Sequence, residues 1–285
     1  LGDIDPDWGW TRNAIVDLLT EGLGEAPGAL TFAERDRIWA ILRPITDDPD
    51  PTAEHEEKYG GKNMDPAQLS INTVRGDAFH ALLEFALWVR RSLDSGVPED
   101  ARLPRSFNAM PEVREVLDAH LDVSLEPSLT IRSVYGRWLP YLAGLDWVWT
   151  CTNLPRILPT QGSETARFQA AWESFVVFDR PNTALLPVLL PYYQHAVRQL
   201  DSVENQMDHP ARPDDRLGEH LVIYYWLDKL QIESEDGLIR EFFARASDRA
   251  RAHLAWFVGR SVSRWEETVP AAVYDRLRAL FEYRL

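Results

Sequence analysis

Hydrophobic residues recur along most of this chain at intervals of three and four, the spacing that places side chains on one face of an α-helix. The first such segment, DWGWTRNAIVDLLTEGLG, carries Trp10 and Leu18 at these intervals. The next, TFAERDRIWAILRPI, opens with Thr31 and Glu34, which have the spacing of a capping box. The pattern predicts a helix over each segment, the second spanning about residues 32–42.

Two stretches interrupt this periodicity. The first, about residues 45–68, is polar and holds prolines and paired glycines, and the second covers about residues 95–110. Long connections of this kind are uncommon in compact domains and are often functional. Between them the pattern predicts a long helix over residues 72–93, and a shorter one follows over residues 111–121.

From about residue 124 the connections shorten. Pro140 is expected to kink or end one helix, and Ser163, Ser234 and Ser247 stand where helix caps are expected. Two runs of strand-like composition, FVVF and LVIYYW, lie inside longer helical patterns and are interpreted as helical. Helix pairs recur at intervals of about 40 residues, in the range of helical-hairpin repeats.

These features predict an all-α fold. Short links make neighbouring helices antiparallel, so we expect antiparallel pairs stacked as a HEAT- or TPR-like α-solenoid or as a compact helical array. Residues 1–285 are expected to form a single helical-repeat-like domain, with long loops in residues 1–123 and tighter helix pairs in residues 124–285.

Composition narrows the functional classes. The chain has 285 residues, of which 45% are hydrophobic, enough for a large buried core. Its formal net charge of −15 disfavours binding to nucleic acid or to an anionic membrane, and favours a basic partner. No apolar run approaches the roughly 20 residues of a membrane span. The single cysteine, Cys151, excludes an intrachain disulfide, and its apolar neighbours are typical of a buried thiol.

Familiar targeting and cofactor motifs are missing from the sequence. The chain starts at Leu1 without a signal-peptide pattern, so it is interpreted as a cytoplasmic piece of a longer protein. It contains neither G-x-x-x-x-G-K-[ST] nor G-x-G-x-x-G, and no cofactor is expected. Three histidines with apolar neighbours, His195, His220 and His253, are interpreted as structural.

The clearest candidate for chemistry is a polar cluster in the apolar segment SINTVRGDAFHALLEFALWVRR. Asp77, His80 and Glu84 share one side of the predicted helix, and Arg75 completes the cluster. Such groups can bind a metal ion, but the chain lacks the E-x-x-H pairs of a di-iron bundle. We therefore favour a buried brace, in which replacing Asp77 or His80 by alanine destabilises the fold. Buried acids need partners, which Arg75, Arg132 or Arg137 could supply.

The second candidate is the acidic segment TDDPDPTAEHEEKYGG. It lacks the spacing of a calcium loop, and the chain lacks the second acidic ligand set of a terpene-cyclase-like magnesium enzyme. We interpret the segment as a solvated loop at an edge of the fold that contacts a basic partner, with salt-sensitive binding. Its candidate contact residues are Asp47, Asp48, Asp50, His55, Glu56, Glu57 and Tyr59.

Three stretches carry a resemblance to known proteins: NMDPAQLSINTVRGDAFHALLEFALWVRR, RLGEHLVIYYW and LIREFFARASDRARAHLAWFVGRSV. They resemble the C-terminal helical region of large bacterial multidomain proteins, many with an N-terminal effector and an ATPase, and some active in anti-phage defence. The resemblance covers most of the chain and implies a HEAT- or TPR-like scaffold for sensing or assembly. It carries no assigned chemistry, so no catalytic residue is transferred.

The function expected from the sequence is a non-catalytic helical scaffold for protein interaction or sensing. Its partner is expected to be another protein or another domain of the same chain. The alternative is an all-α metal-dependent hydrolase or lyase that uses the polar cluster or the acidic loop. A stoichiometric metal in the purified protein would favour that alternative.

Overall fold

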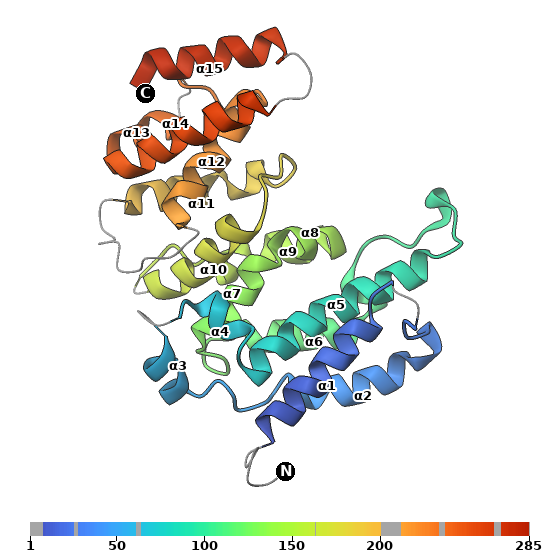
Figure 1. Cartoon of the computed structure of the whole chain (residues 1–285). Helices are drawn as coiled ribbons and strands as arrows, with labels where there is room; N and C mark the ends of the chain where they lie inside the picture. The colour runs from blue at the N-terminus through green and yellow to red at the C-terminus, as the bar shows by residue number, and fades with distance from the viewer. Residues whose placement is uncertain are drawn as a thin grey trace. The chain divides into compact units, whose positions relative to one another are not determined.

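The computed structural model describes residues 8–25, 28–60, 64–162, 164–200, 212–233, 237–264 and 269–284. Within these ranges the regular structure consists of fifteen α-helices and three short 3-10 helices, with no strand (Figure 1). The predicted all-α class is therefore confirmed. The runs FVVF and LVIYYW lie inside helices α10 and α12, so their helical interpretation is also confirmed. No helix in the described ranges combines the length and apolar character needed to cross a membrane.

The chain divides into two compact units, Leu1–Phe175 and Val176–Leu285. The division falls inside α10 and not near residue 123, where the loops shorten. The reason lies in packing, because α7 rests on α4 and α5 and so belongs with the first unit. The helices of this unit are α1 (Gly9–Gly22), α2 (Arg35–Ile45), α3 (Ala53–Tyr59), α4 (Pro66–Ser70), α5 (Val74–Asp94), α6 (Pro111–His120), α7 (Leu129–Arg137), α8 (Leu139–Leu145), α9 (Trp147–Ile157) and α10 (Thr165–Phe178).

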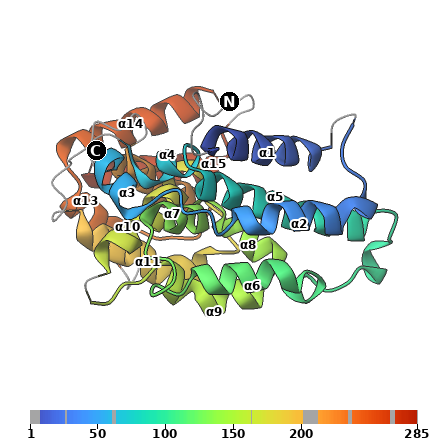
Figure 2. The same cartoon turned by 90° about the horizontal axis from the view of Figure 1, so that it is seen from below.

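Helix α5 is the centre of unit 1. It contacts α1, α2, α4, α7 and α8, and α1 and α2 lie beside it in two views (Figures 1 and 2). Most of its residues are buried, including Phe79, Phe85 and Trp88, because apolar side chains occur on nearly every side of this helix. Helix α7 also approaches α10 closely. A Cβ atom at Gly136 would collide with the backbone carbonyl of Ala171, so this crossing requires glycine.

Unit 2 contains two helices that run parallel to each other. Arg249 pairs with Asp215, and four residues further along both helices His253 pairs with Glu219. These contacts show that α12 and α14 run in the same direction, while α11 packs on α13 and α15 on α12. The helices are α11 (Leu186–Gln199), α12 (Pro213–Trp226), α13 (Leu238–Arg245), α14 (Asp248–Ser263) and α15 (Ala271–Arg284).

A buried hydrogen-bond network ties α11 to α12. The hydroxyl of Tyr193 lies 2.7 Å from Nδ1 of His220, and Nε2 of His220 lies 3.1 Å from the carbonyl oxygen of Asp179. Because a carbonyl only accepts, Nε2 carries the ring proton and Tyr193 donates to Nδ1. Burial lowers the pKa of His220 to about 4, so the ring is neutral. The structural interpretation of His220 is confirmed.

The largest differences from the predicted elements occur near residues 45–68. This stretch contains the short helices α3 and α4, whose first turns are capped by the side chains of Thr52 and Asp65. The predicted Thr31 capping box is wrong, because that side chain forms no cap and residues 32–34 form a 3-10 turn before α2. Short polar helices carry little hydrophobic periodicity, which explains why the pattern did not reveal them.

Several predicted helix ends are confirmed. Helix α6 starts at Pro111. Helix α7 ends at Arg137, and Pro140 lies in the first turn of the next helix, α8. The side chain of Ser247 caps α14 by accepting a hydrogen bond from the N–H of Ala250. Helix α13 begins at Leu238, directly after Gly237, whose positive φ of 59° is a conformation that glycine adopts readily. The predicted caps Ser163 and Ser234 lie outside the described residues.

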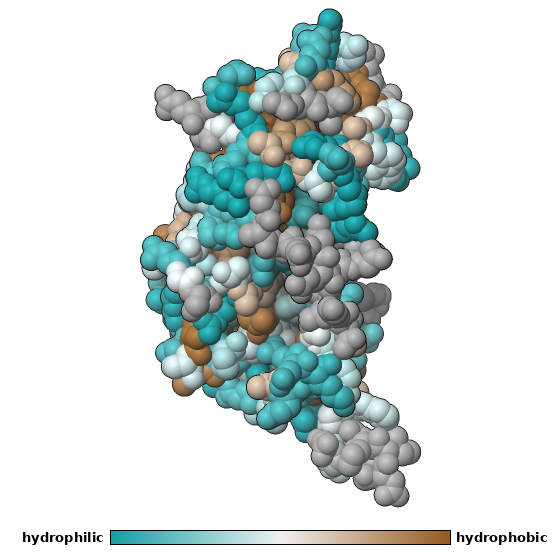
Figure 3. All heavy atoms as spheres, turned by 90° about the vertical axis from the view of Figure 1, so that its left-hand side faces the viewer, coloured by the Kyte–Doolittle hydropathy of each residue, from teal (hydrophilic) through white to brown (hydrophobic). Residues whose placement is uncertain are grey.

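Hydrophilic and hydrophobic residues are mixed on the surface. On the face drawn in Figure 3, hydrophobic residues form separated patches among hydrophilic ones.

Candidate functional site

The polar cluster predicted on α5 does not assemble into one site. Asp77, His80 and Glu84 each have a different environment, and within the described ranges no hydrogen bond or ion pair joins them. Glu84 is half-buried and has no polar partner among those residues. All three residues lie on α5 at helical spacing, but different neighbouring helices surround each of them.

His80 acts as a brace between helices. Trp138, between α7 and α8, donates its indole N–H to Nδ1 of His80 at 2.8 Å. Nε2 therefore carries the ring proton and donates to the hydroxyl of Ser70 at 2.8 Å, and that hydroxyl donates to the carbonyl of Ala67. Burial, together with the charge of Arg137, lowers the pKa of His80 to about 3. Both ring nitrogens of this neutral imidazole are thus engaged.

Asp77 has a different environment from the one predicted. Burial, and then the nearby charge of Asp17 on α1, raise the pKa of Asp77 to about 6. Two of the three candidate arginines have other partners: Arg75 pairs with Glu126, and the buried Arg132 donates to the carbonyl of Arg156. Both partners lie on other segments of the chain, so a pattern within one helix could not show them.

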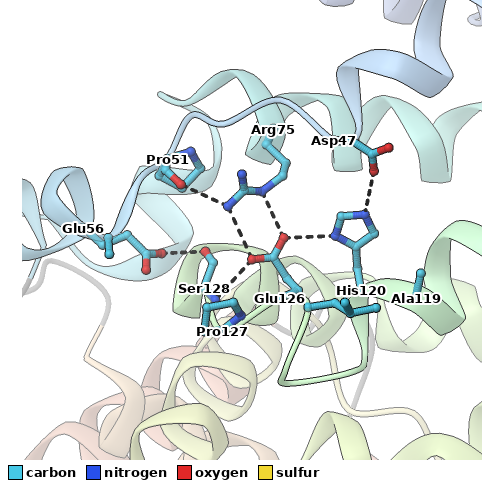
Figure 4. A pocket seen from close by; sticks show the side chains of 11 residues that line it. Asp47, Pro51, Glu56, Arg75, Ala119, His120, Glu126, Pro127 and Ser128 are labelled. Carbon is cyan, nitrogen blue, oxygen red and sulfur yellow. Dashed lines mark hydrogen bonds and ion pairs between the residues drawn. The ribbon is translucent and has the colours of Figure 1, made fainter.

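Residues from both predicted sets meet instead in a pocket of unit 1 with a volume of about 570 Å³ (Figure 4). Asp47 and Glu56 come from the acidic segment, and Arg75 comes from α5. The opposite wall is the turn between α6 and α7, which sequence reasoning did not select. The other lining residues are Pro51, Ala53, Ala119, His120, Leu125, Glu126, Pro127 and Ser128.

Glu126 is the centre of the polar network in this pocket. Its carboxylate is only 4% exposed. Arg75 faces both of its oxygens, with Nε at 3.0 Å from Oε2 and Nη2 at 3.3 Å from Oε1. The backbone N–H of Ser128 also donates to Oε1 at 3.2 Å. Arg75 further donates to the carbonyls of Asp48 and Pro51, so one guanidinium holds the acidic segment against the α6–α7 turn.

His120 bridges two carboxylates. Its Nδ1 lies 3.0 Å from Oε2 of Glu126, and its Nε2 lies 3.2 Å from Oδ1 of Asp47. One imidazole therefore links the α6–α7 turn to the acidic segment. Partial burial acts to raise the pKa of Asp47, but hydrogen bonds from Arg43 and His120 outweigh it and lower that pKa.

Glu56 lies at the beginning of α7. Its Oε1 accepts from the hydroxyl of Ser128 at 2.6 Å and from the backbone N–H of Thr130 at 2.8 Å. Ser128 also caps the helix by accepting from Ile131 N–H. The partial positive charge at a helix N-terminus stabilises a carboxylate there. This contact fixes α3 on α7 and sets the position of one pocket wall.

The acidic segment is more ordered than a solvated loop. Asp48 is 6% exposed and pairs with Arg12 at 2.6 Å, and Asp50 accepts from the backbone N–H of Val74 at 2.8 Å. His55 pairs with Asp50 at 3.1 Å. The expected exposure is therefore wrong for Asp48. The exposed members of the predicted set are Asp47, Glu57 and Tyr59.

Sequence reasoning missed His120, Glu126 and Ser128. One local signal existed, because Pro127 and Ser128 precede an apolar run in the way of a helix cap. Ser128 bonds to Glu56, which lies 72 positions earlier in the chain, and His120 bonds to Asp47, which lies 73 positions earlier. No periodicity reports a contact at that separation.

Two further kinds of reactive group were considered among the described residues: metal-binding clusters and the single thiol. They contain no group of three or more His, Cys, Asp and Glu side chains arranged to hold a metal ion. Cys151 is free and partly buried, and burial raises the pKa of its thiol. Protonation makes a thiol a weaker nucleophile, in keeping with an unreactive role.

Comparison with known proteins adds no assignment. The chain matches no protein-family model, and no curated protein or solved structure matches it significantly. Function is therefore inferred from the geometry and charge of the residues themselves.

Proposed function

We propose that this chain is a non-catalytic helical module that binds a protein segment at the pocket between the acidic segment and the α6–α7 turn. One observation carries the proposal: the histidine and the hydroxyl group that line the pocket already have structural partners. Both nitrogens of His120 face carboxylates, and the hydroxyl of Ser128 bonds to Glu56 while capping α7. A general base needs a free lone pair within reach of its substrate.

The same network leaves a surface suited to a basic partner. Asp47, which pairs with Arg43 and His120, is exposed at the rim, and Glu56 uses only Oε1 for its bonds to Ser128 and Thr130. Beside them Leu125 is 70% exposed, which is unusual for a leucine that lines a pocket. Two carboxylates next to an apolar side chain would accept a lysine or arginine whose alkyl stem packs on Leu125.

Stacked helix pairs support a scaffold role. In unit 2 the helices α11 and α13 pack together, as do α12 and α14, the pairing expected when successive hairpins stack. We take this unit to be a short solenoid-like array, and the whole module to serve in sensing or assembly. A pre-ordered pocket on such a scaffold binds with little cost in ordering its own residues.

The test is a selection of short peptides from a random library on the whole chain. We expect the selected peptides to carry a lysine or arginine next to an apolar residue. Replacing Asp47 by Asn together with Glu56 by Gln should weaken their binding by about tenfold or more, because two charge-assisted contacts are lost. Raising the salt concentration should weaken wild-type binding mainly through the association rate.

A matched control comes from Glu57→Gln, which removes an exposed carboxylate from the same helix but outside the pocket lining. Leu125→Ser should weaken binding, whereas Val123→Ser, an exposed apolar residue outside the lining, should not. Selected peptides without basic residues, or equal losses for Glu56→Gln and Glu57→Gln, would overturn the proposal.

A further inference from the structure

A second cavity lies entirely in unit 2 and has the opposite charge character. It is a groove of about 460 Å³ along the facing sides of α12 and α14. Its volume is within the range of small-molecule sites. Four of its lining side chains are arginines and two are aromatic: Arg212, Arg216, Arg260, Arg264, Trp256 and Phe257.

The acids in this groove are already neutralised. Asp215 is 9% exposed and receives two hydrogen bonds from Arg249, at 2.7 and 2.8 Å. Glu219 is 6% exposed, and its two oxygens accept from Arg216 and His253, each at 2.7 Å. These buried carboxylates therefore contribute little negative charge to the open side of the groove.

Two arginines on the open side of the groove do not pair with acids. Arg260 and Arg264 are both exposed, and among the described residues neither guanidinium has a carboxylate partner. On a chain of net charge −15, two such arginines in one groove are unexpected. Arg260 lies over the ring of Trp256, with its Cζ 5.0 Å from the centroid, and that indole is 54% exposed.

The ligand chemistry follows from these two kinds of group. Guanidinium groups bind phosphate through paired hydrogen bonds, and a planar base stacks on an indole or on a guanidinium plane. We propose that this groove binds a nucleoside phosphate, with the phosphates on Arg260 and Arg264 and the base stacked beside Trp256. Such a site needs no glycine-rich phosphate loop, which the sequence lacks.

The test is calorimetric titration of the whole chain with ATP, AMP, adenosine, pyrophosphate and a single-stranded oligonucleotide. We expect ATP and AMP to bind. Adenosine and pyrophosphate should each bind about tenfold more weakly or worse, because adenosine lacks the phosphate and pyrophosphate lacks the base. The double substitution Arg260→Gln with Arg264→Gln should weaken ATP binding by about tenfold or more. Trp256→Leu should weaken ATP but not pyrophosphate.

Matched controls separate the site from general charge effects. Arg37→Gln removes an arginine that is 82% exposed in unit 1, and Trp147→Leu removes another exposed indole; neither should change ATP binding. The proposal is overturned if ATP does not bind, or if it binds equally well to the double arginine variant. Pyrophosphate binding as tightly as ATP would refute the stacked base, and an oligonucleotide binding more tightly per site would identify a nucleic-acid surface instead.

Discussion

The pocket of unit 1 and the groove of unit 2 use the same types of residue in opposite ways. In the pocket, Arg75 and His120 point inward and hold the buried Glu126. In the groove, the acids are buried and paired, and Arg260 and Arg264 remain on the surface. Composition alone would describe both regions as mixtures of acidic and basic residues.

The difference teaches that the pairing of an arginine, and not its mere presence in a cavity, indicates whether it can bind a ligand. A guanidinium fully engaged with a buried carboxylate and with carbonyls fixes the fold and has little capacity left for a ligand. An exposed guanidinium without such partners costs little to keep and can bind an anion. The two regions should therefore respond differently to the same kind of mutation.

The largest effect should follow the loss of Arg75. Arg75→Ala leaves the carboxylate of Glu126 buried without its main partner and removes the links to the carbonyls of Asp48 and Pro51. We expect a loss of about 3–5 kcal/mol in the free energy of unfolding. Urea denaturation followed by far-UV circular dichroism measures it. If Arg75→Ala shifted the urea midpoint no more than Arg37→Ala at an exposed position, Arg75 would not be structural, and the pocket would not differ from the groove in this respect.

A double-mutant cycle sharpens this result. Glu126→Gln keeps the shape of the side chain but removes the buried charge that Arg75 neutralises. We expect the combination of Arg75→Met and Glu126→Gln to be less destabilising than the sum of the two single changes, by about 0.5–3 kcal/mol. Additive effects would show that the two residues act independently.

His80→Ala should have the next largest effect. It removes the acceptor of the Trp138 N–H and the partner of the Ser70 hydroxyl, and unmet buried groups cost about 1–3 kcal/mol. His55→Ala, which loses one ion pair of a half-exposed ring, should cost less. Both are measured by urea denaturation.

The pH dependence of His80 has a defined sign. Its pKa is lowered from 6.5 to about 3 in the folded state, so the unfolded chain binds more protons between these values. Its contribution to stability is therefore fully present above pH 6.5 and is lost as the pH falls toward 3. The stability difference between wild type and His80→Gln should shrink over that range.

The sequence predicted the elements that carry strong periodicity. The long apolar helix and the starts at Pro111 and Ser247 follow from hydrophobic spacing and from proline and serine preferences. Helices α3 and α4 could not be predicted this way, because they are short and are held by tertiary contacts such as the one between Glu56 and Ser128.

The candidate site was only half accessible to sequence reasoning. Asp47, Glu56 and Arg75 stood out as charged residues in two separate segments, but their meeting depends on how α3, α5 and α7 pack. Their partners His120 and Glu126 sit in an inconspicuous turn. The grouping of Asp77 with His80 went wrong for the same reason, because helical spacing shows a shared face and not what covers it.

A smaller effect, of opposite sign, is expected at Asp77. Its pKa is raised from 3.8 to about 6 in the folded state, so folding binds protons in that window. Stability from this group therefore increases as the pH falls from about 6 toward 3.8, and the ionised carboxylate destabilises the fold at neutral pH. We expect Asp77→Asn to stabilise the protein at pH 7 by about 1 kcal/mol, a value discounted for partial exposure.

The check is a pair of stability profiles against pH. The gain from Asp77→Asn should shrink as the pH falls from about 6 and should disappear below the unfolded pKa of 3.8, where the wild-type carboxyl is protonated in both states. Asp17→Asn should also stabilise, by less, since Asp17 is the second cause of the shift after burial. Destabilisation by Asp77→Asn at pH 7 would restore the brace interpretation for this residue.

The smallest effect on stability should come from the groove. Arg260 and Arg264 have no carboxylate partner among the described residues, and the stacking of Arg260 on the exposed Trp256 is worth about 0.5–1 kcal/mol at most. We expect Arg264→Gln to change the free energy of unfolding by less than about 0.5 kcal/mol. Arg249→Gln, one turn before His253, should cost clearly more, because Arg249 neutralises the buried Asp215. If Arg264→Gln were as damaging as Arg249→Gln, the surface arginines would be structural, and the contrast between the groove and the pocket would fail.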